Sequence, residues 1–444
     1  MRYVIALLLA ILVPLPSFAM GERPGPMKVV DAALGDYVRA GGVPGLTAAL
    51  LAGGEPAFLS HGVIPGEEKR ALNEDTLFLI ASVSKVFTSV VLADLTREGL
   101  LSPDDPLQKF LPEGVTVPTR NGKVITLRHL ATHTSGLPTF ERGSVDRTKG
   151  TESGWKWVYE RLAGLQLLSD PGEKYLYSNL GVSLLGHALE LRSGVPYESL
   201  VAERLLRPLK MDRTVTKVAG DGEKPVFYFE AGIFTPAGGY HSSARDLARF
   251  VAGALGMAPP RLMESFKLTF QRCGEDAGGG PRHLGWHENA ATGRLSHGGL
   301  QHAWIGIDTA RRIGAVILCT GQTPQIGALG GAVLAALAGE KAVFPVPRPV
   351  AKLPAAALER LAGDYRNTEG KGGTITVTLS PAKDSLLLSF DGKGPSVMWP
   401  ENERVFFCKE WDCELQFPEF SAALAPSVRA VMPHWQGEYL RVDL

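Results

Sequence analysis

A proline-rich stretch, Phe344-Pro345-Val346-Pro347-Arg348-Pro349-Val350, divides this sequence into two parts with different patterns. Proline fixes φ and lacks a backbone N–H, so the stretch can form neither a helix interior nor a central strand. We therefore expect a linker at residues 344–355. A chain of 444 residues is long enough for two folded units, predicted here at 20–343 and 356–444.

The part before the linker mixes helical and strand patterns. Its middle is largely helical, and the antiparallel strands are expected mainly near its end. The predicted helices cover 27–39, 86–95, 155–168, 180–191, 197–205, 244–255 and 326–337, with another from Ile125 that Gly136 and Pro138 stop. The predicted strands lie at 45–59, around the turn Gly53-Gly54, and at 284–286, 295–300, 303–307 and 314–318.

The part after the linker alternates apolar and polar residues in short segments separated by turns. The segments at 373–379, 385–390, 404–407 and 429–432 have the period of two that is typical of half-buried strands. Many short strands with regular turns predict a small all-β barrel over residues 356–444.

The N-terminus has the pattern of a secretory signal. Arg2 is followed by an apolar run from Val4 to Val13 and by a small-residue cleavage site, Ser17-Phe18-Ala19. We expect residues 1–19 to be removed and the mature chain to begin near Met20. The run is too short to span a membrane, and no later stretch is long enough either. The sequence therefore predicts a periplasmic or extracellular protein without a membrane span.

The charges balance, with 46 basic and 46 acidic residues. A strongly basic surface would indicate nucleic acid or an anionic membrane as a partner, and the sequence has no such excess. We therefore expect no nucleic-acid partner; a small-molecule or peptide substrate is what the family resemblance given below implies. The oligomeric state stays open.

Four cysteines would enter a compartment that permits disulfides, and four allow three pairings. Only Cys408 and Cys413 are close in sequence, and apolar strand-like residues flank both, so we predict a disulfide between them. Cys319 lies in the apolar run at 315–318, where a buried thiol is expected.

The segment Ser82-Val83-Ser84-Lys85 places a hydroxyl and an ammonium one helical turn apart at the head of an apolar helix. A desolvated lysine that reaches a serine oxygen favours an acylatable serine. The same Ser-x-x-Lys pattern occurs at Ser153-Lys156 and Ser380-Lys383, so the tetrapeptide alone decides nothing.

Three further motifs support a catalytic role for the first copy. Together, Leu79 to Lys85, His129 to Leu137, Tyr177-Ser178-Asn179 and His297-Gly298-Gly299 resemble the class C β-lactamase family. That family includes related penicillin-binding D-Ala-D-Ala carboxypeptidases, D-aminopeptidases and esterases. The resemblance covers roughly residues 27–340.

The resemblance implies a fold of the α/β (α+β) class, in which an antiparallel sheet is flanked by helices and carries an all-helical subdomain. The tail from about residue 356 looks like the lipocalin-like β-barrel that is appended to some members.

The resemblance also implies a role for each matching residue. Ser82 matches the acylated nucleophile, Lys85 the residue that orients it and takes part in proton transfer, and Tyr177 the general base. Asn179 would bind the amide carbonyl of the substrate. The backbone N–H groups of Ser82 and Leu300 would form the oxyanion hole.

The third motif departs from the Lys-Thr-Gly of penicillin-recognising enzymes. His297 stands in place of the lysine and Gly298 in place of the threonine, while Gly299 is retained. These three residues are expected to bind the substrate, but without the ammonium and hydroxyl that would grip a carboxylate. The family implies hydrolysis of β-lactams or D-amino-acid peptides through an acyl-enzyme. The alternatives are a carboxylesterase and a penicillin-binding sensor without turnover.

Two other chemistries find little support. His129 and His133 are four residues apart in a predicted helix, but the sequence contains no His-Glu-x-x-His. It also lacks the Gly-x-Ser-x-Gly of α/β-hydrolases. We therefore expect neither a metal nor a cofactor.

Overall fold

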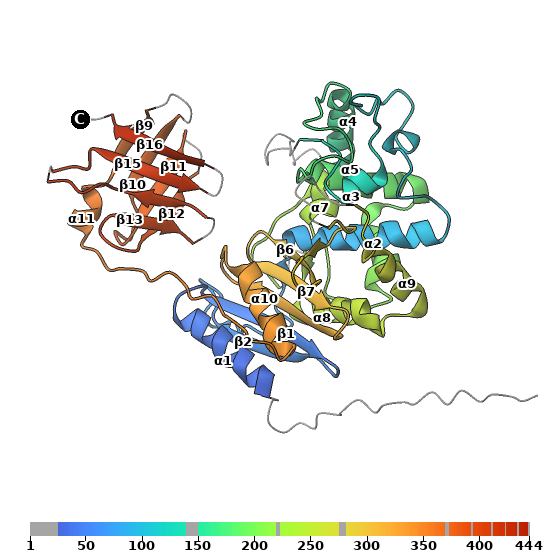
Figure 1. Ribbon diagram of the computed structural model, residues 1–444, viewed down its shortest axis with the longest axis horizontal. Coiled ribbons are helices and arrows are strands. Elements are labelled where there is room, and N and C mark those ends of the chain that lie inside the picture. The colour runs from blue at the N-terminus through green and yellow to red at the C-terminus, as the bar shows by residue number, and fades with distance from the viewer. Residues whose placement is uncertain are drawn as a thin grey trace, which may run out of the picture.

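The computed structural model describes residues 25–138, 150–218, 223–274, 281–368, 373–391, 394–409, 412–421, 423–432 and 435–442. The predicted signal at 1–19 lies outside these residues. Two folded units are joined by residues 341–354, which contain neither helix nor strand (Figure 1). This stretch covers nearly all of the predicted linker.

The N-terminal unit is built on a six-stranded antiparallel sheet with the order β2-β1-β8-β7-β6-β5. The antiparallel pairing confirms the expectation from sequence. The strands are β1 (Gly45–Ala52), β2 (Ala57–Gly62), β5 (His287–Glu288), β6 (Leu295–Gly299), β7 (Ala303–Asp308) and β8 (Ile313–Cys319).

Helices cover both faces of this sheet. Two helices, α1 (Gly25–Arg39) and α10 (Ile326–Leu337), lie together on one face, and α8 (Ala244–Ala252) packs on the other (Figure 1). Burial on both faces explains why the strands at the centre of the sheet have long apolar runs. In β1, Leu50 points into the core beneath α1 and α10, while Ala49 and Leu51 point into the core on the α8 side.

A helical region adjoins the sheet on the α8 side. Its central element, α2 (Ser84–Arg97), is buried from Ser84 to Leu95, as its almost uniformly apolar sequence predicted. The other helices are α3 (Leu127–Ala131), α4 (Gly150–Leu162), α5 (Asn179–Ser193), α6 (Tyr197–Val201), α7 (Thr235–Gly238) and α9 (Pro260–Thr269). The helices and the antiparallel sheet together confirm the predicted fold class.

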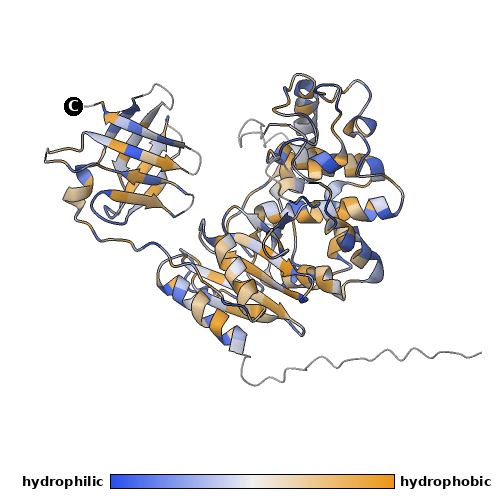
Figure 2. Cartoon of the chain, in the orientation of Figure 1, coloured by the Kyte–Doolittle hydropathy of each residue, from blue (hydrophilic) through white to orange (hydrophobic). Residues whose placement is uncertain are grey.

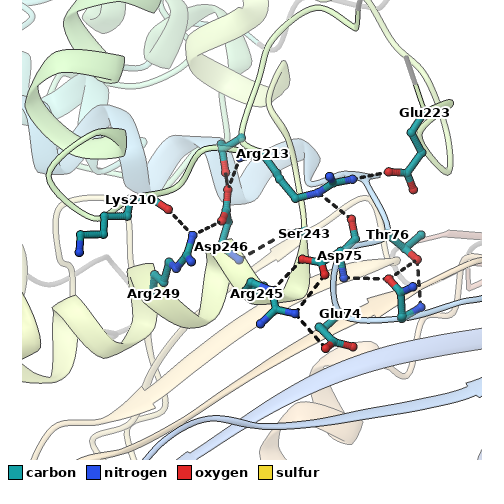
Figure 3. Close-up of polar contacts among 12 residues, drawn as sticks. Glu74, Asp75, Thr76, Lys210, Arg213, Glu223, Ser243, Arg245, Asp246 and Arg249 are labelled. Atoms are coloured by element: carbon teal, nitrogen blue, oxygen red, sulfur yellow. Dashed lines mark hydrogen bonds and ion pairs between the residues drawn. The ribbon is translucent and has the colours of Figure 1, made fainter. Parts of the chain in front are cut away.

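An ion-pair network fixes the segment that leads into the short strand β3 (Phe78–Leu79). Arg245, at the start of α8, donates from Nε to Asp75 Oδ1 at 2.7 Å and from Nη2 to Glu74 Oε1 at 2.9 Å (Figure 3). The hydrogen bonds from Arg245 hold the pKa of Asp75 below its usual value. The network thus anchors the chain immediately before the residues that carry Ser82.

The C-terminal unit is a closed eight-stranded barrel with the order β10-β11-β12-β13-β14-β15-β16-β9, which confirms the predicted barrel. Polar and apolar residues alternate along its strands (Figure 2). The helix α11 (Ala355–Glu359) precedes it. The strands are β9 (Gly363–Asn367), β10 (Thr374–Leu379), β11 (Leu386–Phe390), β12 (Ser396–Pro400), β13 (Val405–Cys408), β14 (Glu414–Gln416), β15 (Ser427–Met432) and β16 (Trp435–Arg441).

Cys408 and Cys413 face each other across the β13–β14 hairpin. The Cys408 N–H donates to the Cys413 carbonyl at 2.9 Å, and their positions continue the register of the two strands. Cys413 carries a thiol, so the disulfide is not formed in this structure and stays a prediction. Cys319 is the buried thiol that was expected, and burial raises its pKa to about 12.

Three local expectations were wrong, one of them the helix expected over 155–168, which ends at Leu162. Residues 284–286 do not form a strand, because Gly285 has a φ of +75° and breaks the extended backbone. The helix expected through His133 ends at Ala131, and His133 itself has a φ of +57°. His129 and His133 are therefore not on one helix face.

Among the described residues, no helix is both long and apolar enough to cross a membrane.

Candidate active site

Ser82 lies in a 3₁₀ turn, Ala81–Val83, which leads directly into α2. The turn begins with Ala81 at a φ of +44°, a left-handed conformation that is uncommon for a residue with a side chain. Strained backbone of this kind often occurs at functional sites. Ser82 is therefore presented by a tight turn ahead of the helix, and not by the first regular turn of α2.

Lys85 is buried, with 1% of its surface exposed. Its Nζ donates to Ser82 Oγ at 2.9 Å and to the carbonyl oxygen of Ala237, in α7, at 2.5 Å. A buried ammonium needs such partners because it has lost its water. The ammonium is thereby held against the serine oxygen, as the sequence predicted.

Tyr177 lies in the segment just before α5, and its side chain reaches Ser82. Its hydroxyl donates to Ser82 Oγ at 2.7 Å, and Lys85 Nζ lies 4.8 Å from the centre of its ring. The structure thus brings Ser82, Lys85 and Tyr177 together, although 95 residues of sequence separate the serine from the tyrosine.

The residues around Tyr177 hold its ring in place. Ser178 caps α5, accepting a hydrogen bond from the Gly181 N–H at 3.0 Å. The Ser178 N–H donates to His133 Nδ1 at 3.1 Å, and the His133 ring packs on Tyr177 with centroids 4.3 Å apart. Burial, followed by the charge of Lys85, lowers the pKa of His133 well below its usual value. His133 is therefore neutral and can accept this hydrogen bond.

Asn179 is the first residue of α5, two positions after Tyr177. It is half-buried, and among the described residues its side-chain amide has no hydrogen-bond partner. Its role in binding the substrate carbonyl stays a prediction.

The end of β6 packs directly on the turn that carries Ser82. A Cβ atom added to Gly299 would lie 2.1 Å from the carbonyl oxygen of Ile80 and 3.2 Å from the Ser82 nitrogen. Only glycine permits this approach, which brings the residue before Leu300 against the Ser82 amide. Gly298 is exposed, and an added Cβ would find nothing closer than 3.8 Å.

His297, in β6, is buried and is not a surface residue. It is 3% exposed and donates from Nδ1 to the carbonyl of Gly285 at 2.8 Å. Burial, followed by the charges of His287 and Lys85, lowers its pKa well below the usual value. Its ring lies 4.8 Å from His287 and lines a cavity of about 260 Å³ together with His133 and Tyr175. His297 is therefore a neutral residue in the wall of this cavity.

The Ser-x-x-Lys copy at Ser380 does not reproduce the arrangement. The Ser380 hydroxyl donates to Asp384 at 3.1 Å, and Lys383 Nζ lies 4.0 Å from Glu359. The side chain of Ser153 lies outside the described residues. Of the two copies whose side chains the structure describes, only the first has its lysine bonded to its serine.

Sequence reasoning missed three contributors to the site. The Ala237 carbonyl binds Lys85 through the backbone, which no side-chain pattern signals. His133 and His287 flank Tyr177 and His297. For His133 the signal was available, since it lies inside the motif that ends in Gly136-Leu137.

No group of His, Cys, Asp or Glu side chains suited to a metal ion occurs in the described part of the chain. His129 instead completes the cap of α3, where its Nδ1 accepts from the Thr126 N–H at 3.2 Å.

The sequence matches the Beta-lactamase family over residues 30–340. The chain belongs to the beta-lactamase family. This family assignment covers the sheet, the helical region and the whole of the candidate site, and it places the chain among serine hydrolases.

Among curated relatives of this beta-lactamase family member, the D-alanyl-D-alanine-carboxypeptidase/endopeptidase AmpH of Escherichia coli K12 is 34% identical over 225 residues. The match covers 47% of this chain and 57% of AmpH. A Putative beta-lactamase-like 1 protein of Homo sapiens is 31% identical over 44% of this chain and 42% of its own length. The chain thus spans about half the length of these relatives.

Solved structures support the fold. An octameric penicillin-binding protein homologue from Pyrococcus abyssi aligns with a TM-score of 0.61 and 21% identity, covering 93% of this chain and 99% of its own. The D-alanine carboxypeptidase AmpC from Burkholderia cenocepacia aligns with a TM-score of 0.58 and 24% identity, over 71% and 98% of the two chains. At these identities the similarity is one of fold.

Proposed function

We propose that this protein is an exported serine hydrolase that cleaves amide bonds of β-lactams or D-amino-acid-containing peptides through an acyl-enzyme at Ser82. The observation that carries the proposal is the convergence of two groups on one oxygen. Ser82 Oγ lies 2.9 Å from Lys85 Nζ and 2.7 Å from the Tyr177 hydroxyl. An unassisted serine is a weak nucleophile at neutral pH, and these neighbours supply its activation.

Acylation begins with attack of Ser82 Oγ on the substrate carbonyl. The serine proton passes to the Lys85–Tyr177 pair, which later delivers a proton to the leaving amine. Lys85 Nζ lies 4.8 Å from the Tyr177 ring centre, where its positive charge would stabilise negative charge that develops on the tyrosine oxygen during proton transfer. The amides of Ser82 and Leu300 stabilise the oxyanion of the tetrahedral intermediate. In deacylation, water attacks the ester carbonyl of the acyl-enzyme and gives its proton to the Lys85–Tyr177 pair. The pair returns a proton to Ser82 Oγ as the acyl product leaves.

Asn179, the first residue of α5 and two positions after Tyr177, would bind the amide carbonyl of the substrate. His297, Gly298 and Gly299, at the end of β6, are the other residues that we propose to contact the substrate. The lack of a side chain at Gly299 lets β6 pack closely on the Ile80 carbonyl, just before Ser82. The relatives named as carboxypeptidases and beta-lactamases support an amide substrate with a D-configured or bicyclic acyl part.

A carboxylesterase is the second candidate, and one observation favours it. His297 is buried with a lowered pKa, and Gly298 has no hydroxyl, so these residues lack a cation and a hydroxyl for a substrate carboxylate. An ester substrate does not need that grip. Weak β-lactam turnover together with rapid ester hydrolysis would support this second function.

A substrate panel tests the proposal on the mature protein. Nitrocefin, a D-Ala-D-Ala peptide, D-amino-acid p-nitroanilides and short p-nitrophenyl esters would be compared in wild type and Ser82→Ala. We expect turnover of at least one amide class, abolished by the substitution. Ester turnover alone would favour the carboxylesterase, and a burst of one equivalent without turnover would support a penicillin-binding sensor. Amide turnover by Ser82→Ala would refute the proposal.

We further propose export by the N-terminal signal and the division into residues 20–343, 344–355 and 356–444. The signal pattern at 1–19 supports the first point, and N-terminal sequencing of the protein recovered from cell fractions tests it. A mature chain that begins near Met20 is the expected result.

A further inference from the structure

The turn between β6 and β7 has an unusual backbone. Leu300 and Gln301 have φ values of +44° and +59°, and the His302 N–H donates to the Gly299 carbonyl at 3.0 Å to close the turn. Two successive left-handed residues are typical of Asn-Gly turns, because other side chains disfavour this conformation. A turn with leucine and glutamine at these positions needs support from its surroundings.

The segment that faces this turn is strained in the same way. Ala81 has a φ of +44° and immediately precedes Ser82. The two amides assigned to the oxyanion hole, those of Ser82 and Leu300, thus belong to or adjoin left-handed residues on separate chain segments. The distance between these amides depends on whatever ties the segments together.

His302 ties them together. Its Nε2 lies 2.7 Å from the carbonyl oxygen of Leu79, three residues before Ser82, and its Nδ1 lies 3.1 Å from the carbonyl oxygen of Leu300. A carbonyl oxygen only accepts, and a neutral imidazole carries a single N–H, so we assign the donated hydrogen bond to the shorter contact, from Nε2 to the Leu79 carbonyl. Leu79 and His302 are separated by 223 residues, and the bond to Leu79 therefore joins two distant parts of the chain.

Neighbouring residues shield the hydrogen bond from His302 to Leu79 from water. His302 is 1% exposed, and the Phe227 ring packs on it with centroids 4.8 Å apart. On the other side, Gln322 Nε2 donates to the Leu300 carbonyl at 2.9 Å, and the Thr323 N–H donates to the Gln301 carbonyl at 2.8 Å. A hydrogen bond shielded in this way is not readily replaced by solvent.

We propose that His302 is a positioning residue of the oxyanion hole. It holds the Leu300 turn against the Leu79–Ser82 segment and so sets the spacing of the two amides that receive the oxyanion. This inference rests on the proposed function of Ser82. It concerns the rate of acylation and not the recognition of the substrate, because the His302 ring itself is buried.

The test compares His302→Phe with a matched control, His241→Phe. His241 is also fully buried, in the short strand β4 (His241–Ser242), and among the described residues neither of its ring nitrogens has a hydrogen-bond partner. Both variants keep an aromatic ring and lose both ring nitrogens. His302→Gln, which restores a single donor group, serves as the conservative variant.

We expect His302→Phe to lower kcat by about 10- to 100-fold with little change in KM, as for a modest displacement of oxyanion donors. An arylboronic acid, whose tetrahedral adduct with Ser82 places an oxygen between the two amides, should lose affinity by the same factor. His241→Phe should keep both values, and His302→Gln should recover part of the loss. A general structural defect would not make kcat and boronate affinity fall in parallel.

Three outcomes would separate the claims. If wild-type protein forms no Ser82 adduct with the boronic acid or a fluorophosphonate, the proposed function fails. If wild type forms the adduct and His302→Phe retains wild-type kcat and boronate affinity, the positioning role is wrong. If His302→Phe fails to fold, His302→Gln decides: an unchanged kcat refutes the role, and a reduced kcat with matching loss of boronate affinity supports it.

Discussion

The barrel and the region around Ser82 bury very different groups. The barrel interior is mainly apolar, with side chains such as Leu388, Phe406 and Leu415 fully buried. The region around Ser82 instead buries Lys85, and it contains two residues with left-handed backbone, Ala81 and Leu300. A fold gains nothing in stability from such features, so their concentration in one place indicates function.

The largest effect is expected from the two groups that converge on Ser82. Lys85→Met keeps the length of the side chain and Tyr177→Phe keeps the ring, but each removes the atom that contacts Ser82 Oγ. Either substitution should lower kcat by about 10³-fold, with a much smaller effect on substrate binding. Because the residues act as a unit, the double variant should be little worse than either one. Additive losses in steady-state kinetics would contradict a shared step.

Two neighbouring glycines offer a sharper contrast. Gly299→Ala places a Cβ 2.1 Å from the Ile80 carbonyl, whereas Gly298→Ala meets nothing within 3.8 Å. We expect the first to lower kcat by about 100-fold and to reduce Tm, since it pushes β6 away from Ser82. The second should keep the Tm within about 2 °C. Similar melting curves and activities for both variants would show that the close approach is not needed.

The pH dependence of stability gives a third test. Burial lowers the pKa of His241 to about 4, while in the unfolded chain it has the ordinary value of 6.5. Between these two pH values the unfolded state binds a proton that the folded state does not. The stability that neutral His241 gives the folded state is therefore complete above pH 6.5 and is lost as the pH falls toward 4.

His241→Phe should therefore flatten the stability curve over that range by up to about 3 kcal/mol. Denaturant unfolding at pH 7.5 and pH 4.5 measures the difference. Equal slopes for wild type and variant would show that His241 is protonated as easily in the folded state as in the unfolded one.

Removal of the barrel should affect activity much less. The catalytic groups all precede residue 344, and the exposed hydrogen bond from Lys409 Nζ to the Gly41 carbonyl is a weak link between the two units. We expect residues 20–345 to fold cooperatively and to keep activity within about tenfold of the full chain. Aggregation or non-cooperative melting of the truncated protein would show that the barrel completes the N-terminal core. Lost activity with intact folding would place the barrel at the site.

The smallest effect concerns the barrel alone. Cys408 and Cys413 face each other in the β13–β14 hairpin, and we predict that oxidation joins them. Because the closed loop is short, reduction should lower the free energy of unfolding of the barrel by only about 1–2 kcal/mol. Peptide mapping under non-reducing conditions checks the bond. A link from either residue to Cys273 or Cys319 would contradict the pairing.

Much of the fold could be predicted because local signals were strong. The helix at 326–337 and the strands at 303–307 and 314–318 are long apolar runs between turn residues, and the structure has them within one residue of the expected bounds. The error at 284–286 arose from Gly285, which has a left-handed φ and lies where an added Cβ would meet Ser89 Oγ at 2.5 Å, a tertiary contact that the local sequence does not signal.

The candidate site divides in the same way. Ser82, Lys85 and Tyr177 could be named because their motifs are compact, and the structure brings them together. Contacts through backbone groups left no trace in the sequence. The Ala237 carbonyl on Lys85 and the His302 bridge to Leu79 depend on tertiary packing between segments more than 150 residues apart.

The central claim is that Ser82 becomes covalently acylated, and peptide mass spectrometry tests it most directly. Wild-type protein would be incubated with a fluorophosphonate or a penicillin probe beside Ser82→Ala, Ser153→Ala and Ser380→Ala. We predict one equivalent of label on the peptide that contains Ser82, lost only in Ser82→Ala together with hydrolysis. Label retained by Ser82→Ala, or activity that a chelator removes while this substitution does not, would contradict the account.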